Sequence, residues 1–240
     1  MNKAIIIGAS SGIGRETALL LLQKGWHCGI AARRSAPLEE IKNKYPDQVV
    51  TETIDVNESA AADKLRQLIS RMGGIDLYFH ASGIGKQNRT LEPSIEMNTV
   101  ETNAMGFTRM ITAAYNYMAA NGGGHIAAIT SIAGTKGLGP APSYSATKAF
   151  QNTYLQSLEQ LANARRLNIR FTDIRPGFVA TPLLNDGNHY PILLRPEAVA
   201  KDIVKAIERK KHIRVIDWRW RIITAFWRRI PRFVWRRLRL

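Results

Sequence analysis

The sequence has little cysteine and no long apolar segment. Cys28 is the only cysteine among 240 residues, which excludes a disulfide within the chain and argues against a thiolate metal site, so no metal is expected. No apolar run reaches the ~20 residues of a membrane-spanning helix, and the three isoleucines near the N-terminus are too few for a signal peptide. We therefore expect a cytoplasmic protein, either free or bound peripherally to the inner face of a membrane.

Acidic residues are scarce in the last part of the chain. The net charge is +15, and from residue 209 to 240 twelve Lys and Arg stand against one acid, Asp217. This stretch supplies eleven of the fifteen net charges and four of the five tryptophans. The remainder is close to neutral for its size and has the composition of a globular protein. We therefore divide the chain into a main domain, 1–212, and a basic, aromatic extension, 213–240.

Short β-rich runs alternate with helical patterns along the main domain. This alternation predicts one α/β domain, with a mostly parallel sheet covered by helices on both faces. Ligands of such sheets bind beyond the carboxyl ends of the strands. The predicted strands are 3–7, 27–31, 49–54, 75–79, 125–130 and 168–174, and the predicted helices are 13–24, 36–44, 58–71, 98–120, 142–165 and 196–209.

A glycine-rich loop, GASSGIG, follows the first predicted strand and opens the first helix. Gly8 permits a sharp turn, Gly12 a close approach of the backbone to a pyrophosphate, and Gly14 close packing of helix on strand. Free N–H groups and the helix dipole favour an anion here. A purely structural turn is the alternative, but the strand–loop–helix context favours a dinucleotide, bound by Gly8, Ser10, Ser11, Gly12, Ile13 and Gly14.

Two arginines, Arg33 and Arg34, stand where an NAD-binding domain usually has an acidic residue for the ribose hydroxyls. A guanidinium suits a 2′-phosphate and cannot accept a hydrogen bond from a ribose. The pair predicts NADP(H), and two solvated arginines at a strand end are the alternative.

Tyr144 and Lys148 are four residues apart in a predicted helix and therefore share one face. A phenol has a pKa of ~10, and a nearby ammonium would lower it. Ser131 ends a predicted strand, so its hydroxyl should reach the same edge of the sheet, where it could hydrogen-bond a substrate oxygen that gains charge. Together these residues predict a general acid or base with an oxygen-binding partner.

Four motifs together resemble the short-chain dehydrogenase/reductase family: GASSGIG, SIAG at 131–134, YSATK at 144–148 and RPGFVATP at 175–182. Their order and spacing match through residue 208. The resemblance implies a Rossmann-like doubly wound sheet of about seven strands. It also implies that Tyr144 is the acid in reduction and the base in oxidation, that Lys148 tunes Tyr144 and holds the nicotinamide ribose, and that Ser131 polarises the carbonyl. Asn103 matches the asparagine that anchors a water linked to the lysine.

The same resemblance assigns further cofactor contacts. Asp55 matches the aspartate near the adenine ring, although Asp is also a common helix N-cap. Pro176 and Gly177 would shape the loop after the sixth strand, and Thr181 would meet the nicotinamide carboxamide. Other matched contacts are Val56, Gly83 and Val179. One departure is HASG at 80–83, where the family usually has Asn-Asn-Ala-Gly; His80 is interpreted as a packed residue rather than a titrating one.

The extension combines two stripes at helical spacing. Apolar residues are Ile222, Phe226, Ile230, Phe233 or Val234, and Leu238; basic residues are Arg221, Arg228, Arg232, Arg236 and Arg239. Pro231 should break or kink the helix. Three interpretations stay open: contact with an anionic membrane surface, packing over the substrate site or a partner subunit, and nucleic-acid binding, although no recognised nucleic-acid motif is present.

These patterns predict an NADP(H)-dependent reductase or dehydrogenase for a ketone or aldehyde and its alcohol. A membrane-bound tail would favour an apolar substrate, such as a lipid, retinoid, steroid or long-chain ketone. Apolar residues between 183 and 195 could line its pocket or cap the core. The alternatives are a 3-oxoacyl-(acyl carrier protein) reductase and a non-catalytic dinucleotide-binding scaffold. Apolar faces on 98–120 and 142–165 favour a homo-oligomer.

Overall fold

One seven-stranded parallel sheet forms the centre of the structure, a computed structural model that describes residues 2–184, 187 and 189–238. The strand order is β3-β2-β1-β4-β5-β6-β7, and every neighbouring pair is parallel. The order reverses between β1 and β4, which leaves a crevice at the carboxyl ends of these strands. The strands are β1 Lys3–Ile7, β2 His27–Ala32, β3 Val49–Thr53, β4 Leu77–His80, β5 Gly124–Ile129, β6 Ile169–Arg175 and β7 Ile213–Val215.

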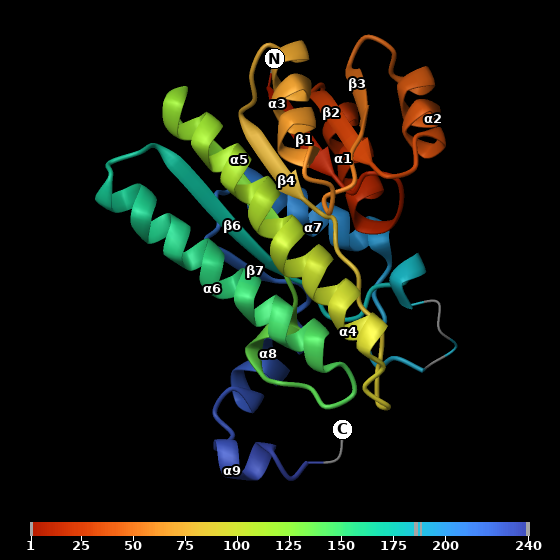
Figure 1. Cartoon of the computed structure of the whole chain (residues 1–240), viewed down its shortest axis with the longest axis vertical. Helices are drawn as coiled ribbons and strands as arrows, with labels where there is room; N and C mark the ends of the chain where they lie inside the picture. The colour runs from red at the N-terminus through yellow and green to blue at the C-terminus, as the bar shows by residue number, and fades with distance from the viewer. Residues whose placement is uncertain (1, 185–186, 188, 239–240) are drawn as a thin grey trace.

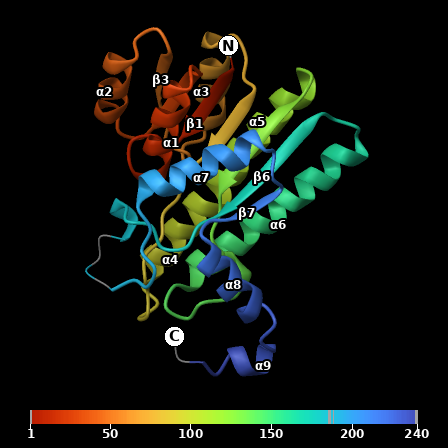
Figure 2. The same cartoon turned by 180° about the vertical axis from the view of Figure 1, so that it is seen from behind.

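Helices cover both faces of the sheet (Figures 1 and 2). One face packs against α1 (Gly12–Gln23), α2 (Ala36–Lys44) and α7 (Pro196–Glu208). The other packs against α3 (Ala61–Arg71), α5 (Phe107–Ala120) and α6 (Pro142–Ala164), while α4 (Pro93–Val100) precedes α5 and contacts α6. The predicted doubly wound α/β fold is therefore confirmed.

The sequence of β1 shows why this strand is central. Successive strand residues point to opposite faces. Ile5 and Ile7 belong to the core cluster under α3, α5 and α6, whereas Ile6 belongs to the cluster under α1, α2 and α7. Each isoleucine is almost completely buried, and such burial contributes about 1.5–3 kcal/mol per side chain. A continuous apolar run therefore anchors both layers to one strand, as in buried parallel sheets.

Most predicted elements lie within a few residues of the observed ones, and the differences are local. The predicted helix 98–120 is interrupted by a π-turn, η1 (Glu101–Gly106), between α4 and α5. The helix predicted from 58 begins at Ala61, so Asp55 does not cap it. The short strand β7 was not predicted as a separate range, and it places the first residues of the 213–240 extension in the sheet. Two 3₁₀ turns, η2 (Ile132–Thr135) and η3 (Pro182–Leu184), flank the carboxyl edge.

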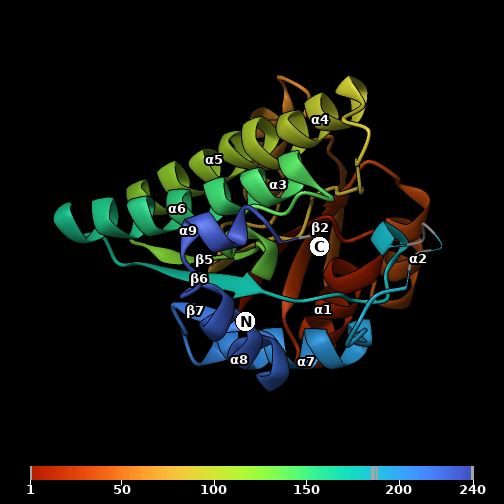
Figure 3. The same cartoon turned by 90° about the horizontal axis from the view of Figure 1, so that it is seen from below.

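The extension forms two short helices, α8 (Trp218–Trp227) and α9 (Arg232–Trp235), and Pro231 separates them as expected. The Asp217 carboxylate caps α8 by accepting a hydrogen bond from Arg219 N at 2.8 Å. Helix α8 lies beside β7 (Figure 3). Trp220 and Thr224 of α8 are buried, whereas most of the predicted apolar stripe is exposed. Arg239 of the basic stripe lies outside the described residues. None of the described helices is long and apolar enough to cross a membrane.

Candidate active site

A cavity of about 1060 Å³ opens at the carboxyl ends of the strands. It brings together the glycine loop, the two arginines and the Ser131, Tyr144 and Lys148 side chains. Asn103 lies behind the wall, and its side-chain oxygen accepts a hydrogen bond from the backbone of Ile84, which lines the cavity. The other predicted cofactor residues also line this cavity: Gly8, Ser10, Ser11, Gly12, Ile13, Gly14, Asp55, Val56, Gly83, Pro176, Gly177, Val179 and Thr181.

The glycine loop is shaped so that a phosphate group fits against the backbone. Gly8 has φ of +92°, a conformation that favours glycine. A Cβ on Gly14 would lie 2.3 Å from Gly8 O, so helix α1 could not approach β1 with any larger residue there. The first turn of α1 has no acidic residue, and no side chain caps its N–H groups. These groups are therefore available to an anion.

Arg34 brings positive charge onto the same loop. Its Nη2 atom donates hydrogen bonds to Ser10 Oγ and Ser11 Oγ, both at 3.2 Å. No acidic residue ends β2, since Ala32 is followed by the two arginines. Asp55 lines the cavity further along, where its carboxylate accepts a hydrogen bond from Asn57 N at 3.0 Å. The arrangement fits a dinucleotide that carries an additional phosphate near the adenine ribose.

Ser131 and Tyr144 both line the cavity, and the Ser131 side chain lies close enough to affect the Tyr144 phenol. Ser131 follows β5 and caps η2, where its Oγ accepts a hydrogen bond from Ala133 N at 3.0 Å. The Tyr144 ring lies against Gly85, where a Cβ would come within 2.5 Å of Tyr144 Cδ2. Loss of water around the phenol raises the pKa of Tyr144, and the hydrogen bond with Ser131 partly opposes this rise.

Lys148 is buried beside this pair. Its Nζ atom donates to Ile129 O at 3.1 Å and to Gln151 Oε1 at 2.9 Å, and lies 5.7 Å from the centre of the Tyr144 ring. Burial lowers the pKa of Lys148 to about 7, and the negative charge of Asp173 only partly offsets this effect. The expected lowering of the Tyr144 pKa by Lys148 is therefore not found, because the ammonium itself is destabilised by burial.

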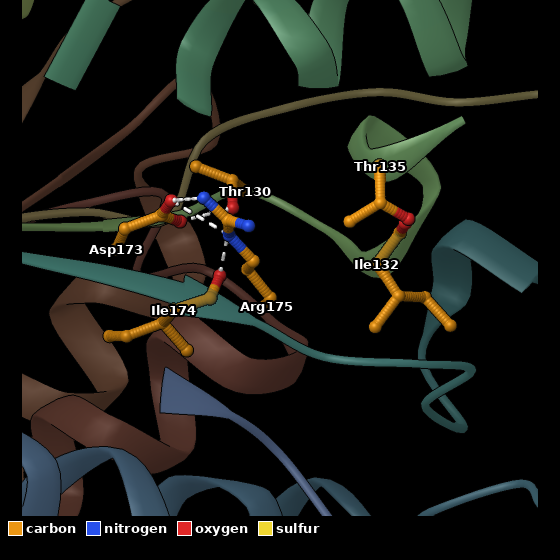
Figure 4. Close-up of polar contacts among 6 residues, drawn as sticks. All are labelled: Thr130, Ile132, Thr135, Asp173, Ile174 and Arg175. Carbon is orange, nitrogen blue, oxygen red and sulfur yellow. Dashed lines mark hydrogen bonds and ion pairs between the residues drawn. The ribbon is translucent and has the colours of Figure 1, made fainter. Parts of the chain in front are cut away.

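The carboxylate that faces Lys148 is held in a buried network at the end of β6 (Figure 4). Asp173 accepts hydrogen bonds from Thr130 Oγ1 at 2.5 Å and from Arg175 Nε at 2.8 Å. Arg175 Nη2 also binds Asp173 at 2.5 Å. These three hydrogen bonds fix the position of the Asp173 carboxylate beneath the site.

Gln151 is the residue of this site that sequence reasoning missed. The side chain is completely buried, with Oε1 accepting from Lys148 Nζ and Nε2 donating to Asn103 O at 2.8 Å. It joins directly the two residues that the family resemblance links through a water. The π-turn η1 holds the Asn103 carbonyl at this position. A polar residue three positions after Lys148, on the same helix face, was the available signal.

His80 occupies the position where the sequence departs from the family pattern. Its ring is fully buried, with Nδ1 2.9 Å from Tyr78 Oη, and packs edge-on against Phe107. Burial and the charge of Lys148 lower the pKa of His80 to about 3. The ring is therefore neutral and structural at physiological pH, as interpreted from the sequence.

The other end of the cavity is aromatic. Phe178 contacts Tyr190 and Trp220, with ring centres 4.7 Å and 5.5 Å apart, and Trp227 also lines the wall. Trp220 lies directly on Gly177, where a Cβ would be 2.2 Å from the indole Nε1. Trp220 and Trp227 of the extension thus line this cavity, which agrees with packing over the site, one of the three interpretations left open above.

The apolar segment 183–195 divides between wall and core. Leu183, Leu184 and Tyr190 line the cavity, whereas Leu194 packs into the core and Leu193 is exposed. Asn185, Asp186 and Asn188 lie outside the described residues.

Comparisons with known proteins agree with this geometry. The family model for short chain dehydrogenases matches residues 2–190. An uncharacterized oxidoreductase of Myxococcus xanthus is 31% identical over 213 residues, which is 86% of this chain and 83% of the relative. Serine dehydrogenase complexed with NADP+ superposes with a TM-score of 0.76 at 24% identity, over 85% of this chain and 88% of the other.

A 3-ketoacyl-(acyl-carrier-protein) reductase from Brucella melitensis, complexed with NADH, superposes with a TM-score of 0.78 at 22% identity. It covers 90% of this chain and 96% of the other. The serine dehydrogenase match and this one show the shared fold. With the family model matching most of its length, the chain belongs to the short-chain dehydrogenase family of oxidoreductases.

Proposed function

We propose that this protein is an NADP(H)-dependent oxidoreductase that interconverts an apolar ketone or aldehyde and its alcohol. The observation that carries the proposal is one cavity lined both by Ser131, Tyr144 and Lys148 and by a glycine loop whose serines accept hydrogen bonds from Arg34. The related folds were solved with NADP+ in one case and NADH in the other, so the choice rests on the arginines of this chain.

The glycine loop, Arg33 and Arg34 would hold the phosphates, and Asp55 and Val56 the adenosine half. Lys148 uses two of its three N–H donors within the protein, which leaves one for a ribose hydroxyl. The bound cofactor supplies or accepts the hydride.

Tyr144 and Ser131 handle the substrate oxygen. In reduction, Tyr144 Oη donates its proton to that oxygen, and the Ser131 hydroxyl donates a hydrogen bond to it. The raised pKa of Tyr144 keeps the phenol protonated at neutral pH, which suits a general acid. In oxidation the same phenol accepts the proton from the alcohol.

Gln151 is a positioning residue in this proposal. Its amide fixes Lys148 against the Asn103 carbonyl and stabilises the ammonium, which burial otherwise opposes. The Gln151 side chain therefore links Lys148 directly to the Asn103 carbonyl.

The aromatic wall supports an apolar substrate, because Phe178, Trp220 and Trp227 offer large apolar surfaces and few polar atoms. The cationic extension would hold the cytoplasmic enzyme against an anionic membrane, where such substrates dissolve. Exposed apolar side chains on α4 and η1 (Met97, Met105) and on α6 (Phe150, Leu161) support a homo-oligomer through these helices.

A substrate panel tests the proposed function. NADPH consumption is followed with ketones and aldehydes graded by chain length and polarity, and we expect turnover to rise with apolar chain length. Turnover only with acyl carrier protein thioesters would favour the 3-oxoacyl reductase, a relationship that the Brucella neighbour suggests by its fold. NADPH binding without turnover of any panel member, at all pH values tested, would favour a non-catalytic scaffold.

A further inference from the structure

A second cavity, of about 820 Å³, lies between α9 and the loop that follows η2. Its wall carries four cations, a tryptophan and a leucine: Lys136, Arg228, Arg232, Arg236, Trp235 and Leu238. None of the residues that line it is acidic. Nothing in the proposed catalysis uses these side chains, so their convergence needs a separate explanation.

The charges in this cavity are not neutralised by the protein. Among the described residues, Arg228, Arg232 and Arg236 make no ion pair, whereas the only acid of the extension, Asp217, is paired with Arg219 at 2.9 Å. Lys136 donates to Ile230 O at 2.8 Å and lies 5.6 Å from the centre of the Trp235 ring. Like charges gathered without a counter-charge favour binding of an anion, and guanidinium groups match phosphate oxygens best.

The surface around this cavity is apolar as well as basic. Phe226 is 71% exposed, Phe233 60% and Ile222 47%, all on the outer side of α8 and α9. Figures 1 and 2 show both helices at the end of the molecule where the strands terminate, which is also where the catalytic cavity opens. Exposed aromatic side chains beside arginines are typical of helices that lie in the headgroup region of an anionic bilayer.

Direct contacts connect this second cavity to the segment 132–137, which follows Ser131. Trp235 Nε1 donates to Gly137 O at 2.7 Å, and Trp227 Nε1 donates to Thr135 Oγ1 at 2.6 Å. Thr135 in turn donates to Ile132 O, the residue after Ser131, and both are drawn in Figure 4. A ligand bound at α9 would therefore contact the segment that directly follows Ser131 of the proposed catalytic site.

We propose that this cavity binds the phosphate of an anionic phospholipid headgroup while Phe226 and Phe233 enter the bilayer interface. The bilayer then lies against the mouth of the catalytic cavity. The proposal deepens the proposed function by naming the surface from which an apolar substrate enters, but lipid binding itself does not depend on that function.

Vesicle flotation of the full chain tests the proposal. Phosphatidylcholine vesicles are compared with vesicles that also contain about 30% phosphatidylglycerol. Each is mixed with the wild type, with the triple variant R228Q/R232Q/R236Q, or with a matched control, K44Q/K201Q/K205Q, whose lysines are exposed on α2 and α7. We expect flotation only with phosphatidylglycerol, a loss of about a hundredfold in partitioning for the arginine variant, and wild-type behaviour for the control. Equal losses of partitioning in both triple variants would overturn the assignment of a lipid site to this cavity and would indicate only non-specific charge attraction.

Two further arms separate the sources of phosphate and the role of the apolar residues. The first arm measures thermal stabilisation by inorganic phosphate. If phosphate stabilises the wild type but not the arginine variant, and the wild type does not float with vesicles, the cavity is a site for a soluble anion and the lipid assignment is overturned. The variant F226S/F233S should lose about tenfold in partitioning but keep the dependence on phosphatidylglycerol. Retained wild-type partitioning would remove these side chains from the interface.

NADPH consumption with a short, water-soluble ketone distinguishes failure of this proposal from failure of the proposed function. The arginine variant should keep that turnover while it loses flotation. Flotation without turnover in the wild type would sink the proposed function alone, and turnover without flotation would sink the lipid site alone.

Discussion

The two ends of the catalytic cavity are built in different ways. At the dinucleotide end, short turns after strands fix the backbone, and glycines such as Gly14 are required because helix and strand approach closely. At the substrate end, side chains from distant segments make the wall, including Trp220 and Trp227 from the extension. In the proposed function, the first end holds the cofactor and the second selects the substrate. A substitution at one end should therefore leave the properties of the other end unchanged.

The largest effect is expected for Tyr144→Phe, which removes the proton donor and leaves the ring. We expect the kcat for carbonyl reduction to fall by about 10²- to 10⁴-fold, because phenylalanine has no hydroxyl that could donate the proton. NADPH affinity, measured by fluorescence titration, should change little, since the phosphates bind at the far end. Wild-type turnover in this variant would remove Tyr144 from the mechanism.

Arg34→Asp should act on the dinucleotide end alone. The change removes a cation that contacts Ser10 and Ser11 and adds a group that can accept from ribose hydroxyls. We expect NADPH affinity to fall by about a hundredfold and NADH affinity to rise, with the order of substrate preference unchanged. Equal affinities for NADPH and NADH in the wild type would sink the assignment of the arginines to a 2′-phosphate.

The pH dependence tests the link between Gln151 and Lys148. Because the pKa of Lys148 is lowered to about 7 and the ammonium form binds the cofactor, kcat/KM for reduction should decline as pH rises through that value. Gln151→Leu removes an acceptor and should move this decline about one unit lower, whereas Gln151→Glu adds a carboxylate and should move it higher.

The control for this series is Gln156→Leu, at an exposed position of the same helix. A purely structural role for Gln151 predicts loss of stability in both variants but no opposite movement of the pH profile. Identical profiles for wild type, Leu and Glu would therefore exclude the positioning role.

The smallest effect is expected for Trp227→Ala at the substrate end. We expect KM to rise about tenfold for long apolar ketones and to change little for short ones, because part of an apolar wall is removed. Trp218→Ala is the matched control, since Trp218 is 64% exposed and lines neither cavity. Equal effects on short and long substrates would indicate a general disturbance of the loop at 135–137 instead.

The sequence was most informative where backbone geometry demands particular residues. Glycines and strand ends predicted the fold, the loop at residues 8–14 and the edge at which Ser131 and Tyr144 meet, because these depend on local conformation and on sheet topology. Gln151 could not be identified in advance, since its role depends on a π-turn that brings the Asn103 carbonyl within reach. The apolar stripe of the extension does not identify the side chain that packs against the main domain. That side chain is Trp220, which is buried because Gly177 leaves room for its indole.

The seating of Trp220 on Gly177 also gives the protein a natural optical reporter. Four of its five indoles belong to the extension, and two of these line the catalytic cavity. Tryptophan fluorescence therefore comes mainly from the extension and the cavity wall. Its intensity and emission maximum should change when a ligand enters this cavity or when the extension contacts lipid, without any attached dye.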